Sequence, residues 1–347
     1  MTIHTKSQYP LLRLLRYISE YKKSYLTASL FSFLNKLFDV FPEILIGGAV
    51  DIVVNGKHSW LSRLLTIESI DNQLYVLGAL TFLIWAFESF FQYLYSLSWR
   101  NLAQTVEHKV RMDCYQHIQN APLPIIEKNQ TGQLISILND DINQLERFLE
   151  DGFNQIIQIT SSTILIGAVF LWCSPLITLF AILPVPFILI GAFYFQHKLE
   201  PRFLAVREKA AHIAAALSHN LLGMATIKSF TNEPQELRKI ETLSHSYQSA
   251  NEQTIKISAM VTPVIRIVIL CGFMATLLIG GYQTLHGTMN VGIFSVLVFL
   301  SQRLLWPFSN LAEVTVNYQR AMASTTRALN LLTWPQEQFA INKDQPE

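Results

Sequence analysis

Charged residues are scarce in this chain. Of its 347 residues, 50% are hydrophobic and only 15% are charged, whereas a soluble protein carries about 25% charged residues. The shortage is concentrated in apolar blocks long enough to cross a bilayer, which takes about 20 residues as a helix. The formal net charge is +1, so no overall positive field would attract a nucleic acid. The composition therefore indicates an integral membrane protein without a nucleic-acid partner.

Cysteine is also scarce, and its positions form no pattern. Cys114, Cys173 and Cys271 are odd in number and far apart in the sequence. Neither a disulfide framework nor a metal site follows from such spacing. We therefore expect no metal ion in this chain.

A cleavable signal peptide is missing as well. Residues 9–23 alternate charged and apolar side chains and contain no continuous apolar core. One face of a helix over this stretch would be apolar: Leu11, Leu14, Leu15, Ile18 and Tyr21. The opposite face would be charged, and this pattern predicts a short amphipathic helix at the membrane surface.

Six apolar blocks follow, near residues 25–50, 74–97, 156–173, 176–195, 259–282 and 291–312. The middle pair has no charged residue from Ile156 to Phe195, and Ser174-Pro175 interrupts it near its centre. About 40 residues would make about 60 Å of helix, which is two crossings joined by a tight turn. We predict an all-α membrane protein with six long transmembrane helices.

The basic residues indicate the orientation of these spans. If the N-terminus is cytoplasmic, 21 of the 26 lysines and arginines fall in cytoplasmic segments, three fall inside the spans, and only Lys57 and Arg63 fall on the outer side of the membrane. The positive-inside rule then places both termini in the cytoplasm. No organelle transit peptide is visible, so a bacterial plasma membrane, the inner membrane, is the default expectation.

Two cytoplasmic regions, residues 98–155 and 196–258, are each about 60 residues long. Helical stripes connect both regions to the spans: Leu134, Leu138, Leu145, Leu149 and Phe153 in the first, and Ala205, Ala210, Ala214, Leu217 and Leu221 in the second. The second stripe has small residues, which suit close helix contact. Breaks at 121–124 and Gly132, and at Gly223 and Pro234, predict that each region runs out, turns and returns. Two small globular domains are the alternative, but the patterns continue without interruption into the spans.

Four stretches of the sequence then point to one family. They are 131–143 (TGQLISILNDDIN), 217–233 (LSHNLLGMATIKSFTNE), 41–54 and 306–327. In this order they resemble the stretch after the first coupling helix, the second coupling segment, the end of the first span and the end of the sixth span of ABC exporters. The likeness is collinear over roughly residues 10–332.

The resemblance implies an ABC exporter transmembrane fold with two helical cytoplasmic extensions. Residues 1–23 would be the N-terminal elbow helix, 24–332 the six-span domain, and 333–347 a linker toward a nucleotide-binding domain. A second transmembrane half would complete the pathway as a homo- or heterodimer, which works by alternating access. Transport direction comes from the resemblance alone.

The resemblance also implies two coupling segments, roughly 124–129 and 226–233, that dock onto the nucleotide-binding domains. The residues expected to make this contact are Pro124, Ile125, Ile126, Glu127, Thr226, Lys228, Phe230, Thr231 and Glu233. A short helix at the end of a rigid arm can transmit motion over about 40 Å. We expect Ile125, Ile126 and Glu127 to be exposed at the first tip.

No ATP site is visible in the sequence. The only Gly-Lys pair is Gly56-Lys57, and Asp51 stands where a phosphate-binding loop needs its first glycine. We therefore expect no catalytic residue and no cofactor in this chain, and expect ATP and Mg²⁺ in a partner ATPase domain. A separate ATPase subunit and a truncated fused gene are both open explanations.

Several charged residues lie inside the predicted spans: Lys36, Asp39, Glu43, Glu88, Arg266 and Arg303. The first three share one helical face, and a charge at the bilayer centre costs about 2.5–3.5 kcal/mol. These residues could line a translocation cavity or fix helix packing by pairing, and Lys36 with Asp39 forms a possible i,i+3 pair.

Two other functions compete with the exporter hypothesis. An ion-coupled secondary carrier would have inverted repeats, short loops and broken helices at the midplane, and the long cytoplasmic regions disfavour it. A truncated, non-transporting membrane scaffold would tolerate loss of the coupling tips, which are present here. The interior mixes aromatic and charged side chains, so the sequence selects no substrate.

Overall fold

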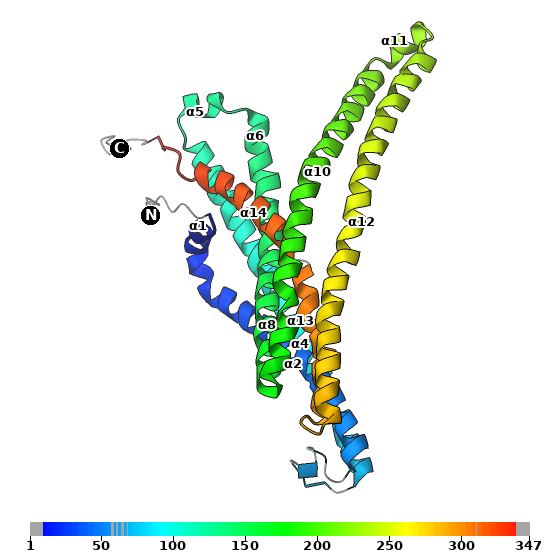
Figure 1. The fold of residues 1–347 in the computed structure, drawn as a ribbon. Helices are drawn as coiled ribbons and strands as arrows, with labels where there is room; N and C mark the ends of the chain where they lie inside the picture. The colour runs from blue at the N-terminus through cyan, green and yellow to red at the C-terminus, as the bar shows by residue number, and fades with distance from the viewer. Residues whose placement is uncertain are drawn as a thin grey trace, which may run out of the picture. The chain divides into compact units, whose positions relative to one another are not determined.

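The chain is built from helices, several of them long (Figure 1). The structure is a computed structural model, and it describes residues 10–56, 59, 62–63, 66–67, 69–309 and 311–337. No strand occurs among these residues. They divide into two compact units, and the first contains the described residues up to Cys173, Thr284–Leu300 and those from Glu313 onward. The second contains Ser174–Gln283 and Ser301–Ala312.

The first unit holds the N-terminal half of the chain. Its helices are α1 (Pro10–Tyr17), η1 (Ile18–Tyr21), α2 (Lys22–Asn55), α4 (Ile70–Gln119), α5 (Leu123–Lys128), α6 (Thr131–Ser136), η3 (Ile137–Asp141), α7 (Ile142–Arg147), η4 (Phe148–Gly152) and α8 (Phe153–Cys173). Most of α14 (Leu311–Leu331) and the first half of α13 (Val291–Ser309) also belong to it. The segments η3 and η4 are π-helical turns within an otherwise α-helical run.

The second unit is dominated by two very long helices. It consists of α9 (Pro175–Ile182), α10 (Pro184–Leu222), α11 (Met224–Ser229) and α12 (Glu233–Leu285), with the second half of α13. At 1.5 Å per residue, the 53 residues of α12 make about 80 Å of helix. Buried Ile188, Ile265 and Leu305 pack together from α10, α12 and α13.

Five helical runs are long and apolar enough to cross a membrane: Ile70–Gln119, Thr131–Cys173, Pro175–Leu222, Glu233–Leu285 and Val291–Leu331. The predicted break in the middle apolar pair is confirmed, because α8 ends at Cys173 and the side chain of Ser174 accepts a hydrogen bond from the Ile177 amide at the start of α9. The first predicted span lies in α2, whose 34 residues are long enough to cross but are not among the five. Its charged residues reduce its apolar character, so a count of six stays a prediction.

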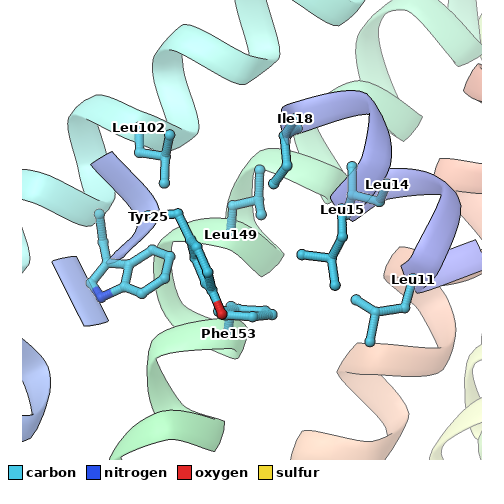
Figure 2. A pocket seen from close by; sticks show the side chains of 9 residues that line it. Leu11, Leu14, Leu15, Ile18, Tyr25, Leu102, Leu149 and Phe153 are labelled. Atoms are coloured by element: carbon cyan, nitrogen blue, oxygen red, sulfur yellow. The ribbon is translucent and has the colours of Figure 1, made fainter. Parts of the chain in front are cut away.

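The predicted amphipathic helix is present, but its apolar face packs on protein. Leu14 and Ile18 are buried against the core of the first unit. Figure 2 shows both side chains lining a narrow crevice together with Leu102 and Leu149. Burial of an apolar side chain contributes about 1.5–3 kcal/mol, so these contacts hold the N-terminal elbow to the bundle.

Polar contacts tie the same elbow to its neighbours. The Tyr17 hydroxyl donates to the Asp113 carboxylate on α4, and burial together with this bond raises the pKa of Tyr17. Arg13 donates to the Asn330 side chain and the Leu329 carbonyl near the end of α14, at 3.1 and 3.3 Å. The elbow therefore bridges α4 and the C-terminal helix.

An ion pair joins the first arm, residues 98–155, to α14. Arg327 Nε donates to Asp141 Oδ2 at 2.6 Å, Arg327 Nη2 donates to Oδ1, and the Ser324 hydroxyl donates to Oδ1 at 2.8 Å. The Asp141 side chain is 8% exposed and that of Arg327 is 52% exposed. A two-pronged guanidinium contact fixes both position and orientation. We call Asp141, Ser324 and Arg327 the α14 joint.

The helices α2 and α13 cross at two glycines in the first unit. A Cβ atom on Gly47 would lie 2.2 Å from Val296 Cγ2 and 2.6 Å from the Gly292 carbonyl oxygen. On Gly292 it would lie 2.8 Å from the Gly47 carbonyl oxygen. Small residues allow this close backbone approach between membrane helices.

Replacement of Asp141 by asparagine should destabilise the purified chain by about 2 kcal/mol, because hydrogen bonds to a charged group contribute about 1.5–3 kcal/mol. The measurement is unfolding of the chain in detergent. The matched control is Arg100→Gln, which removes the more exposed Arg100–Glu150 pair and should change stability by less than about 1 kcal/mol. Equal losses of stability in the two variants would contradict the proposed contribution of the α14 joint to stability.

Replacement of Gly47 by alanine should lower stability by about 1–3 kcal/mol, since the added methyl group overpacks the crossing. Gly167→Ala in α8 is the control, because a Cβ atom there would meet nothing within 4 Å. Unfolding of both variants in the same detergent provides the comparison. If Gly47→Ala were as stable as Gly167→Ala, the helices would not cross at this distance.

Candidate functional site

The first predicted coupling segment is a separate short helix. Helix α5 lies between α4 and α6 (Figure 1), and Pro122 precedes it as the N-cap residue. The Asn129 side chain donates to the Ile125 carbonyl at 2.7 Å and closes its C-terminal end. The sequence breaks at 121–124 therefore mark a real interruption, as the prolines predict.

The side chains of this first tip differ from the expectation in one respect. Pro124 and Glu127 are exposed, but Ile125 and Ile126 are only half-buried, not exposed. Ile126 packs against the core cluster of the first unit. Leu123, which was not among the predicted contact residues, is 61% exposed. At this tip, therefore, Leu123 is exposed and Ile126 attaches the helix to the core.

The second predicted coupling segment forms the turn between α10 and α12 (Figure 1). Helix α11 ends in a tight turn, in which the Asn232 amide donates to the Ile227 carbonyl at 3.0 Å and the Thr231 amide donates to the Lys228 carbonyl at 3.2 Å. This pair of bonds is a Schellman motif. Thr231 takes the left-handed position with a φ of 49°, where glycine is usual.

The surface of the second tip is strongly apolar. Phe230 is 77% exposed and Leu222 is 87% exposed. Three further apolar side chains of the tip region are exposed: Leu221, Met224 and Leu237. The predicted polar residues Thr226, Lys228, Thr231 and Glu233 are also exposed. We call these nine residues the α11 tip.

Leu217 and Leu221 were predicted to belong to a stripe for close helix contact, but both are exposed. Leu222 and Leu237 were missed altogether. The signal was available, since a break at Gly223 leaves the leucines on both sides of it near a turn, where no neighbouring helix of the same arm covers them.

The charged residues of the spans fall in both units. Lys36 Nζ lies 3.0 Å from Asp39 Oδ2 in α2, which confirms the predicted i,i+3 pair, and both side chains are about a fifth exposed, at 23% and 22%. Glu43 is buried one turn further along α2. Glu88 on α4 is half-buried, and its carbonyl accepts a hydrogen bond from the Asn35 side chain at 3.0 Å.

The remaining two predicted cavity residues belong to the second unit. Arg266 is exposed, and its guanidinium carbon lies 6.0 Å from the centre of the Trp306 ring. Arg303 is half-buried. Four of the six charges therefore belong to α2 and α4 of the first unit, and Arg266 and Arg303 belong to the second unit.

No group of three or more metal-ligating side chains occurs among the described residues. The arrangement instead combines apolar helices, two helical tips and charged residues within the spans.

Comparison with known proteins agrees with this arrangement. A family model described as the ABC transporter transmembrane region matches residues 25–308. The uncharacterised ABC transporter ATP-binding protein YknU of Bacillus subtilis is 24% identical over 320 residues, which are 92% of this chain and 53% of that protein.

Two further relatives have names that describe transport. The multidrug efflux ATP-binding/permease protein Rv0194 of Mycobacterium tuberculosis is 27% identical over 67% of this chain and 19% of its own length. The ATP-dependent lipid A-core flippase of Aliivibrio fischeri is 21% identical over 72% of this chain and 43% of its own length. The chain spans about half of YknU and less of these two.

The helical architecture, the several membrane-spanning helices and the family model over residues 25–308 agree with one another. The chain is a multi-pass membrane protein, and it belongs to the ABC transporter transmembrane family.

Proposed function

We propose that this chain is the membrane-spanning half of an ATP-driven exporter. It would form the translocation pathway together with a second transmembrane half and work by alternating access in a bacterial plasma membrane, with both termini cytoplasmic. The family match and the relatives named for efflux and lipid flipping support this function. These names belong to longer proteins, so the substrate is not carried over.

The exposed apolar surface of the α11 tip is the observation that carries this proposal. Phe230 and Leu222 lie at the far turn of an arm whose other end holds the apolar block 259–282. Exposed apolar patches on a soluble surface mark interaction sites. Full burial of each such side chain would contribute about 1.5–3 kcal/mol to binding. A groove on an ATPase domain is the partner surface that we propose.

The first tip would work differently, because it is anchored to its own unit. Ile126 packs on the core, and the α14 joint connects the returning helix to the C-terminal helix. A force on Leu123 or Glu127 would therefore pass directly into the first unit. The Glu337 amide donates to the Asn120 carbonyl at 2.8 Å, so the start of the proposed linker lies beside this tip.

ATP and Mg²⁺ would bind in the partner ATPase domain, which supplies the phosphoryl chemistry. Closure of two such domains around nucleotide would draw the arms together. This movement would change the side of the membrane to which the cavity opens. This chain would contribute the helical arms that transmit the motion and the translocation pathway.

We also propose that the charged face of α2 lines the pathway. Lys36 and Asp39 neutralise each other, which lowers the cost of placing them in the membrane. They nevertheless keep about a fifth of their side chains exposed, and Glu43 follows on the same face. Contact with water in a cavity explains this better than contact with lipid, where charge is costly. Glu88, Arg266 and Arg303 are weaker candidates for the same lining.

The test uses the full chain in liposomes with the ATPase domain encoded beside or downstream of it. Replacement of Phe230 by alanine should reduce the affinity for that domain at least tenfold, because the loss of one buried aromatic side chain costs more than about 1.4 kcal/mol. The measurements are co-sedimentation of the ATPase with the liposomes and the ATP turnover that the chain stimulates.

Phe203→Ala is the matched control, since Phe203 is an exposed aromatic residue on α10 away from the turn. It should leave the ATPase affinity unchanged. Equal affinity of the Phe230→Ala and wild-type chains would remove the coupling role of the α11 tip. The absence of any neighbouring ATPase gene would remove the proposed motor.

A further inference from the structure

The outer side of the N-terminal elbow carries two lysines beside an apolar stripe. Lys22 and Lys23 begin α2 and are exposed. One and two turns further along the helix, Leu26 and Leu30 are 51% and 53% exposed, and Phe33 follows on the same side. Residues spaced by three or four lie on one helical face. We call these five residues the α2 stripe.

The direction of the α2 stripe is fixed by what lies behind it. Ala28 and Ser32 on α2 are fully buried, and the Trp99 indole donates to the Ser32 hydroxyl at 3.0 Å. The apolar face of the preceding elbow is buried as well, at Leu14 and Ile18 (Figure 2). The inner faces of both segments are therefore occupied by protein, and the α2 stripe points away from the core.

The charge pattern marks the depth of this region in the membrane. No charged residue occurs between Lys23 and Lys36 on α2 or between Glu88 and Arg100 on α4. Lys22 and Lys23 thus stand at the edge of the apolar layer.

Neighbouring carboxylates do not neutralise the two lysines. Glu20 pairs with Lys109, and Glu150 pairs with Arg100 at 2.8 Å. Within the part of the chain that the structure describes, no carboxylate pairs with Lys22 or Lys23. The two lysines are therefore open to contact with an anion from outside the chain.

We propose that Lys22 and Lys23 bind the phosphate of an anionic phospholipid whose acyl chains lie along Leu26, Leu30 and Phe33. Positive charge at the headgroup level next to exposed apolar side chains matches such a lipid in both charge and polarity. Each lysine near an anionic membrane surface contributes about 1 kcal/mol. A bound lipid would brace the elbow at the point where it turns into α2. This site depends only on the membrane location of the chain and stands whether or not the transport proposal holds.

The test titrates phosphatidylglycerol onto the full chain in detergent, with native mass spectrometry to read the bound fraction. Lys22→Gln combined with Lys23→Gln should weaken binding of the tightest lipid about 30-fold, which corresponds to about 2 kcal/mol. Phosphatidylcholine should bind the wild-type chain and this variant equally. Glycerophosphate without acyl chains should not compete, because it lacks contact with the leucines.

The control variant combines Arg207→Gln with Arg238→Gln, which removes two charges from the far arm. It should bind phosphatidylglycerol like the wild-type chain. Equal binding by the Lys22/Lys23 variant would overturn the proposal, as would competition by free glycerophosphate. A change in oligomeric state of that variant without a change in lipid binding would assign the α2 stripe to a second copy of the chain and also overturn it.

Discussion

The placement of the first arm within its unit depends on the contact between Asp141 and Arg327. It joins residues 186 positions apart in sequence and fixes the end of α14 to the returning helix of the first arm. The Asp141 carboxylate is nearly buried. Loss of Arg327 would leave this charge unpaired and poorly solvated, which would destabilise the fold. Arg111 adds a parallel link, since it donates from α4 to the Leu138 carbonyl at 3.2 Å and to the Asn143 side chain at 2.8 Å. The first tip therefore stands on a base that is tied together by polar contacts as well as by apolar packing.

The second arm has a different design. Its packed base contains Ile188, Ile265 and Leu305, whereas many side chains beyond it are exposed and the α11 tip is apolar. A long helical pair with an exposed apolar end is expected to find support outside its own chain. In our proposal the two arms therefore have different roles. The first arm is held firmly within its own unit, and the second arm contacts a partner and transmits motion.

Much of this organisation was predictable because its signals are local. The apolar blocks, the helix break at Ser174 and the breaks at the two tips follow from hydropathy and from the conformational limits of proline and glycine. The Lys36–Asp39 pair was predictable from its spacing alone. Long-range contacts were not. Asp141 and Arg327 lie in two stretches that resemble the family, but their spacing in sequence carries no sign that they meet.

Exposure was also difficult to predict. Ile126 was expected at the surface and packs on the core, because the direction of a side chain on a six-residue helix depends on how that helix docks. The apolar face of the elbow was expected at the membrane surface and packs on α4 and its neighbours. In both cases the apolar character of the residue was correctly identified, and the surface that covers it depended on tertiary packing.

The joint between the first arm and α14 is tested most directly by hydrogen exchange on the full-length chain. If the contact between Asp141 and Arg327 makes the two segments that it joins open together, Arg327→Gln will raise the amide exchange rates of residues 137–152 and 321–331 to the same degree. The second arm, residues 196–258, will exchange as in the wild-type chain. Faster exchange in only one of the two joined segments would contradict this picture, because the segments would then open independently.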